Sequence, residues 1–129
     1  MTYERGTALE YFLQIKRPED FRYSKGNFLD DFRYANDTER IRMVREMIRP
    51  EQMNEDQQKY AAFFAAMVEH VCYHTGIEIP SWTHHEIFFL SEPWFTRNSW
   101  RLRAWQLVTT PPAFKRRNIF CGDNALERV

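Results

Sequence analysis

Apolar side chains recur at intervals of three and four residues through most of this chain, which is the spacing of an amphipathic helix. Alternating β-branched runs and short hairpin turns, the patterns typical of strands, are missing. The longest helical pattern runs from about Asn54 to Thr75 without Pro or Gly, and Gly76 follows it as a residue that ends helices. Its apolar positions form a wide stripe: Tyr60, Phe63, Phe64, Met67, Val68, Val71 and Cys72. We therefore expect this segment to be the central helix.

Shorter helices are predicted around it, over about Thr7 to Lys16, Gly26 to Tyr34, Thr38 to Ile48 and Asn98 to Val108. The first, third and last of these stop at prolines 18, 50 and 111. The last has an apolar side that we expect to face the core: Trp100, Ala104, Trp105, Leu107 and Val108. One more helical turn at Pro111 and Pro112 carries Phe114, whereas Glu92 to Phe95 reads as an irregular loop. The predicted fold class is all-α, a single domain over residues 1–129, built as an irregular bundle of five to six helices around the long central one.

Composition supports one core without a metal or disulfide. The 129 residues include eleven Phe, six Tyr and four Trp, so each core position carries a large apolar side chain. Cys72 and Cys121 form no CxxC pair and suit a reducing compartment, with Cys72 inert on its helix and Cys121 more exposed. The N-terminus lacks the pattern of a signal peptide, and no apolar run is long enough to span a membrane. We expect a cytoplasmic protein that needs no cofactor.

Charge is distributed unevenly although the net charge is zero. Residues 51–96 carry one Lys or Arg against seven Asp or Glu, and residues 97–129 carry seven against two. The basic end includes three consecutive cations, Lys115 to Arg117, which cannot all be buried because an unpaired buried charge is costly. These cations either pair with the acidic middle of the chain or bind an acidic partner. The candidate partner-binding residues are Arg97, Arg101, Lys115, Arg116 and Arg117.

Direct binding of nucleic acid by the basic third remains an alternative, because several arginines and aromatic residues lie close together there. The zero net charge of the chain argues that such binding is weak. The sequence contains no glycine-rich phosphate loop and no GxSxG or GxGxxG motif. Common nucleotide-dependent enzymes are therefore disfavoured.

The four histidines suggest a second alternative, a metal-dependent hydrolase. His70 and His74 are four residues apart and so share one face of the central helix, which is the spacing of a two-histidine metal site. A third ligand could come from His84, His85 or Glu86. The glutamate of the HExxH motif is missing, because Val71 follows His70. Structural or solvated roles explain such histidines better.

Three segments in fixed order carry a resemblance to a known family: MVEHVCYHTGIEIPSWT at 67–83, EPWF at 92–95 and PPAFKRRNIF at 111–120. Together they resemble a family of small bacterial proteins without assigned chemistry, which is similar to the C-terminal region of lambda-repressor-like helix-turn-helix regulators. Those regulators are often regarded as antitoxin-like. The resemblance covers about residues 26–129. The DNA-reading helices of the regulators are not expected here, since the region before Gly26 holds one short helix and a proline.

The resemblance implies an accessory or partner-binding module, linked to a toxin–antitoxin or transcription-regulator locus, and it supplies no catalytic residue. The function we expect is therefore a non-enzymatic, cytoplasmic interaction protein with a protein partner. A homodimer through exposed aromatic residues is a further possibility that the sequence leaves open.

Overall fold

The computed structural model describes residues 5–49 and 54–126, and within them the chain is an all-α bundle with one very small sheet. The helices and strands, in chain order, are α1 (Ala8–Leu13), α2 (Asp20–Tyr34), α3 (Asp37–Val44), α4 (Glu55–Thr75), η1 (Ser81–His84), η2 (Glu86–Phe88), β1 (Trp94–Phe95), η3 (Trp100–Leu102), α5 (Arg103–Thr109), α6 (Pro112–Lys115) and β2 (Ile119–Phe120). The η elements are single turns of 3₁₀ helix. None of the helices in the described residues combines the length and the apolar character that a membrane crossing requires.

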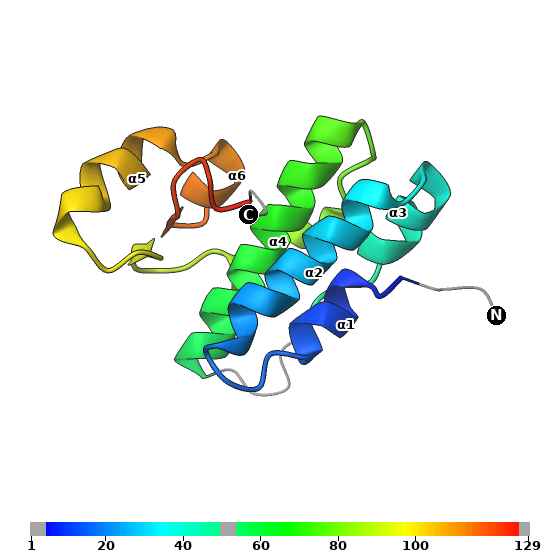
Figure 1. The fold of residues 1–129 in the computed structure, drawn as a ribbon, viewed down its shortest axis with the longest axis horizontal. Coiled ribbons are helices and arrows are strands. Elements are labelled where there is room, and N and C mark those ends of the chain that lie inside the picture. Colours follow the sequence, from blue (N-terminus) through cyan, green and yellow to red (C-terminus); the bar gives the residue numbers. More distant parts are fainter. Residues whose placement is uncertain (1–4, 50–53, 127–129) are drawn as a thin grey trace.

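Helix α4 is the central helix, as its sequence predicts. Asn54 caps its start by accepting a 2.8 Å hydrogen bond from the backbone N–H of Gln57, and Gly76 ends it in the left-handed region at φ 73°. Residues 61–69 are all buried, because α1, α6, η1 and η2 pack around this helix. In Figure 1 α2 and α4 run diagonally, and the ring of Phe28 on α2 lies 6.3 Å from that of Phe64 on α4. Helix α1 packs against α2. The ring of Phe63 lies 4.9 Å from that of Phe114, which joins α4 to the C-terminal third.

The shorter helices depart from their predicted bounds. Helix α2 begins at Asp20 rather than Gly26, and the glycine is buried inside it together with Ser24, where small side chains allow close packing. Helix α3 ends at Val44, and the expected stop at Pro50 lies outside the described residues. Ile41 is exposed on this helix, whereas Met43 and Val44 are buried.

The C-terminal third contains the one pairing of strands in the described residues, which periodicity did not predict. β1 and β2 lie parallel with Trp94 opposite Ile119 and Phe95 opposite Phe120. The backbone N–H of Trp94 donates to the carbonyl of Asn118 at 2.8 Å. The pairing fixes the segment after α6 against the loop before η3. Because each strand has two residues, the fold class remains all-α.

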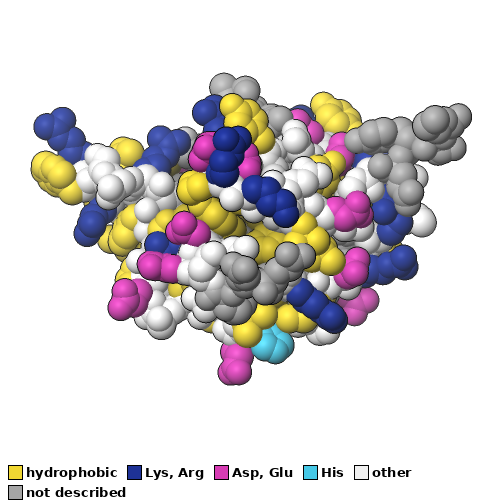
Figure 2. All heavy atoms as spheres, turned by 90° about the horizontal axis from the view of Figure 1, so that it is seen from below, with side chains coloured by type: hydrophobic (Ala, Val, Ile, Leu, Met, Phe, Trp, Pro, Cys, Tyr) yellow, Lys and Arg dark blue, Asp and Glu magenta, His cyan; other side chains and the backbone are white. Residues whose placement is uncertain are grey.

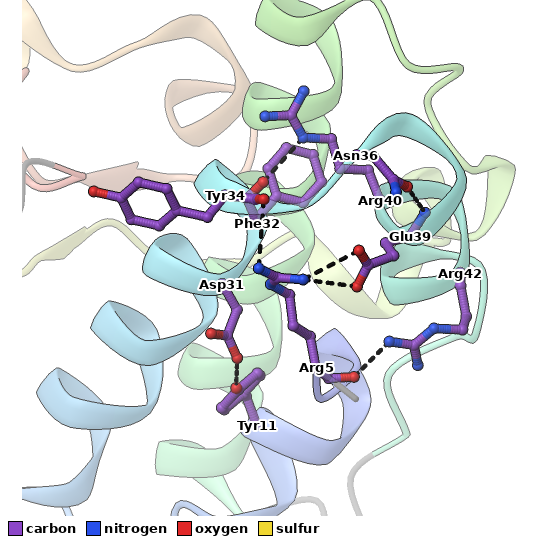
Figure 3. A network of polar contacts seen from close by, with 9 residues as sticks. All are labelled: Arg5, Tyr11, Asp31, Phe32, Tyr34, Asn36, Glu39, Arg40 and Arg42. Carbon is purple, nitrogen blue, oxygen red and sulfur yellow. Dashed lines mark hydrogen bonds and ion pairs between the residues drawn. The ribbon is translucent and has the colours of Figure 1, made fainter. Parts of the chain in front are cut away.

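A polar network joins the N-terminal segment to α2 and α3 (Figure 3). Arg5 donates two hydrogen bonds to the carboxylate of Glu39, at 3.1 and 2.9 Å, and its own carbonyl accepts one from Arg42 at 2.6 Å. The hydroxyl of Tyr11 donates to Asp31 across α1 and α2. The side chains of this network form hydrogen bonds with other segments of the fold, so we assign the network a structural role.

Candidate functional site

Glu69 is the one acidic residue in the apolar middle of α4, and it lies in the core with a side chain that is 6% exposed. Three cationic or titratable groups converge on its carboxylate. Nη2 of Arg116 forms an ion pair with Oε2, while Oε1 lies 3.0 Å from Nη1 of Arg117 and 3.3 Å from Nε2 of His84. Neither contact of Oε1 has hydrogen-bond geometry, so the contact with Arg117 is an ion pair and the contact with His84 is a close polar approach. This set is named the Glu69 cluster.

Arg117 is fully buried, which corrects the prediction that it contributes to a partner-binding surface. Its guanidinium donates to the carbonyl of Ala113 at 2.7 Å and to that of Thr83 at 2.6 Å. The ring of Phe89 covers it, with the guanidinium carbon 4.8 Å from the ring centre. Loss of hydration, together with the neighbouring charge of Arg116, lowers the pKa of Arg117 to about 10. Arg117 therefore joins η1, α4 and α6 instead of contacting a ligand.

The other two consecutive cations stay at the surface, so the expectation that not all three can be buried is confirmed. The side chain of Arg116 is 55% exposed while it contacts Glu69. Lys115 is exposed and donates to the carbonyl of Val108 at 3.2 Å. Of the two interpretations left open for this block, pairing with the acidic middle of the chain holds for Arg116 and Arg117.

Helix α5 is fixed to the fold by its buried side. The amide of Gln106 accepts from the N–H of Arg97 at 3.1 Å and donates to the carbonyl of Leu102 at 3.3 Å. The hydroxyl of Thr110 accepts from the N–H groups of Cys121 and Gly122 at 3.0 and 2.8 Å. These contacts hold the helix, the loop before it and the C-terminal segment in one arrangement.

The opposite side of this segment is apolar and exposed, which corrects the expectation that Trp100, Leu107 and Val108 face the core. Trp100 is 78% exposed and Val108 75% exposed, and Ala104 and Leu107 are also at the surface. These four residues, at helical spacing, are named the η3–α5 face. In Figure 2, Lys and Arg side chains stand beside apolar ones at the left end of the molecule, the end that η3 and the start of α5 form in Figure 1.

Arginines border the η3–α5 face, and each lies over an aromatic ring. The guanidinium carbon of Arg101 is 5.9 Å from the ring centre of Trp100, and that of Arg103 is 5.1 Å from that of Phe95. Arg97 lies similarly over Trp105, at 5.8 Å. Stacking of this kind keeps a guanidinium near an apolar surface while it stays hydrated. The predicted residues Arg97 and Arg101 are therefore beside exposed apolar area.

The histidines do not form the predicted metal site. The rings of His70 and His74 lie 4.3 Å apart between centres, but His84 points to Glu69, and Nδ1 of His85 accepts from the N–H of Ile87 at 3.2 Å. Among the described residues, no three side chains of His, Cys, Asp or Glu come together as metal ligands. Burial and the nearby His74 lower the pKa of His70 to about 4, so its imidazole is neutral at pH 7.

Two hollows adjoin this histidine pair. A groove of about 550 Å³ lies between α2 and α4. One of its charged side chains, Arg40, donates to the carbonyls of Phe32 and Arg33 at 2.9 and 3.0 Å and so serves the fold. The second hollow, of about 360 Å³, lies between α4 and α6 and reaches the Glu69 cluster at Arg116.

Both cysteines are buried, so the expectation of a more exposed Cys121 is wrong, and burial raises the pKa of each thiol to about 12.

Sequence reasoning missed Glu69, although one signal was available. It is the single charged residue between Tyr60 and His70 in a run that is otherwise apolar, and such a residue needs a buried partner. Comparisons with protein families, with curated proteins and with solved structures find no match to this chain. The geometry of these sites is therefore the basis for the functional proposal.

Proposed function

We propose that this chain is a non-enzymatic interaction protein of the bacterial cytoplasm and that an acidic protein segment docks on the η3–α5 face. The observation that carries the proposal is the exposure of Trp100 and Val108, at 78% and 75%, on a helix whose other side is anchored. Clustered large apolar side chains at a surface mark interaction sites. Tryptophan is enriched among the residues that dominate binding energy.

The charge around the face supports an acidic partner. Between residues 97 and 117 the chain has six Lys or Arg and no Asp or Glu, and all of the six except Arg117 are at the surface. A partner with acidic side chains flanking an apolar anchor complements this arrangement, and the opposite charges also accelerate association. The preorganised arginines around Trp100 reduce the entropy lost on binding.

The resemblance to antitoxin-like regulators supports a partner from a toxin–antitoxin or transcription-regulator locus. Such an accessory module needs a binding surface rather than a catalytic site. An apolar centre with a charged border is typical of a protein interface, whereas a nucleic-acid surface is more uniformly basic. For this reason a protein partner is proposed before a nucleic acid.

The test is affinity capture from the native host with the tagged chain, after nuclease treatment, read by quantitative mass spectrometry. Trp100→Ala is compared with Tyr23→Ala, which removes an aromatic side chain of similar exposure, 66%, from α2. We expect an acidic protein that is captured by the wild type and by Tyr23→Ala and is lost with Trp100→Ala. The purified pair should then bind at least tenfold more weakly when Trp100 is replaced.

Charge is tested separately by Arg101→Glu with Arg103→Glu, against Arg22→Glu on the surface of α2 as the control. The double variant Arg101→Glu, Arg103→Glu should bind the partner more weakly and with a smaller dependence on salt, and Arg22→Glu should change neither property. Capture that Trp100→Ala leaves unchanged contradicts the proposal. Capture that nuclease abolishes assigns the surface to nucleic acid instead.

A further inference from the structure

The hollow between α4 and α6 has the features of a small binding pocket in addition to the η3–α5 face. It encloses about 360 Å³ and is lined from α4 by Glu69, His70, Tyr73 and His74, and from α6 and the residue that follows it by Pro112, Ala113 and Arg116. This volume is near the lower end of the range for ligand sites, about 300–1,000 Å³. The rings of Tyr73 and the two histidines and the pyrrolidine of Pro112 give it flat, largely apolar walls.

Positive charge exceeds negative charge at one end of this pocket. The Glu69 cluster has one carboxylate for the two guanidinium groups of Arg116 and Arg117. Arg116 also lowers the pKa of Arg117, as expected for two cations held close together. Glu69 is the one acidic residue of the lining, and its single charge is shared between Arg116 and Arg117. One positive charge is therefore left over, and Arg116 is the member of the pair that solvent reaches.

Arg116 is placed to bind an anion there. Its side chain is 55% exposed, and within the described residues its polar contact is the one from Nη2 to Glu69. A guanidinium has five N–H donors in a planar fork, so further donors remain for a second carboxylate. His70 is neutral at pH 7 and adds hydrogen-bonding capacity without charge. Tyr73, which is 72% exposed, can cover the body of a ligand.

We propose that the α4–α6 pocket binds a carboxylate carried on a small aromatic or apolar body, with Arg116 as the anion-binding residue and Tyr73 as the wall that contacts the body. The carboxylate belongs either to a free small molecule or to the C-terminus of a polypeptide. This inference does not rest on the proposed function, because the lining of the pocket includes no residue of the η3–α5 face.

The test is ¹⁹F NMR titration of 4-fluorobenzoate with the isolated full chain at pH 7. We expect saturable binding that Arg116→Gln weakens at least tenfold. Lys115→Gln is the matched control, because it removes the same charge from the adjacent exposed residue outside the pocket and should leave binding within twofold. Tyr73→Ala, at an exposed position that does not endanger folding, should weaken binding about threefold or more.

A second arm distinguishes the two sources of the carboxylate. N-acetyl-Ala-Phe with a free C-terminus is compared with its C-terminal amide by the same titration in competition with 4-fluorobenzoate. Competition by the free acid alone assigns the pocket to a polypeptide terminus, and no competition by either peptide assigns it to a small molecule.

The proposal is overturned if 4-fluorobenzoate does not bind, or if Arg116→Gln binds it as well as Lys115→Gln does. Trp100→Ala serves as a cross-check, since it should abolish partner capture and leave 4-fluorobenzoate binding unchanged. Partner capture and 4-fluorobenzoate binding are therefore separate measurements, and either proposal can fail without affecting the test of the other.

Discussion

Replacing Glu69 with glutamine tests whether the charge cluster stabilises the fold. The substitution keeps the shape of the side chain but leaves the buried guanidinium of Arg117 beside the cation of Arg116 without a carboxylate. Removing one partner from a buried ion pair costs about 3–5 kcal/mol, and the whole domain is stable by about 5–15 kcal/mol. Arg117 keeps its hydrogen bonds to the carbonyls of Ala113 and Thr83, which favours the lower value. We expect the free energy of unfolding to fall by about 3 kcal/mol.

The assay is urea unfolding at pH 7, followed by tryptophan fluorescence. With an unfolding slope of about 1–3 kcal/mol per molar urea, the midpoint should fall by about 1–3 M. Glu55→Gln is the control on the same helix, because Glu55 is 83% exposed in its ion pair with Lys59. Exposed pairs contribute little, so this change should stay within about 0.5 kcal/mol.

A loss of less than about 1 kcal/mol for Glu69→Gln would refute the reasoning, since an uncompensated buried charge cannot be so well tolerated. A loss equal to that of Glu55→Gln would show that water reaches the cluster. Arg116→Gln provides the internal comparison: its side chain is half-exposed, and Glu69 retains Arg117, so its cost should be below about 1 kcal/mol.

Three further outcomes are expected. Gly122→Ala should lower the free energy of unfolding by about 2–5 kcal/mol, because the residue has a φ of 79° and the new methyl group overlaps the indole ring of Trp105. Gly76→Ala, at φ 73° with open space around it, should lower it by about 1–2 kcal/mol. Equal shifts of the two melting temperatures would contradict this prediction. His70 has a pKa of about 4 when folded against 6.5 as the unperturbed value, so the unfolded state takes up the proton first and stability falls as pH drops from 6.5 to about 4. Over this pH range the free energy of unfolding of His70→Gln should fall by about 1–2 kcal/mol less than that of the wild type, after allowance for partial solvent screening. Parallel pH profiles of the two proteins would exclude the effect. Cys72 and Cys121 should not react with a thiol reagent in the folded state at pH 8 and should both react in urea, because burial raises their pKa values to about 12; rapid labelling of the native chain would contradict their burial.

The central helix could be predicted almost to the residue because its limits are local. Asn54 and Gly76 act on the backbone within one turn, so their effect can be read without knowing the rest of the fold. Helix α2 shows the limit of this reasoning. Gly26 suggested a boundary by its propensity, but tertiary packing places it at a buried position inside a helix.

The candidate sites were harder to predict because they depend on contacts between distant segments. The pairing of Glu69 with Arg116 and Arg117 crosses more than forty residues, and charge totals alone could not select that partner. Helix α5 illustrates a different difficulty, because the apolar side that periodicity assigns to the core is the side that faces solvent. Periodicity did not show that the polar Gln106 faces the interior while Trp100 and Val108 face solvent. The hydrogen bonds of Gln106 to Arg97 and Leu102 decide the orientation.

The Glu69 cluster also bears on how this chain can be divided. Within the described residues, Glu69 forms ion pairs with Arg116 and Arg117 and is contacted by His84, whereas its carboxylate lies on the helix against which α1 packs. A fragment that ends after α4 would carry an unneutralised acid on its most apolar surface. The segment with Arg116 and Arg117 thus acts as an intramolecular ligand of α4, and we expect a truncation that removes it to destabilise the bundle.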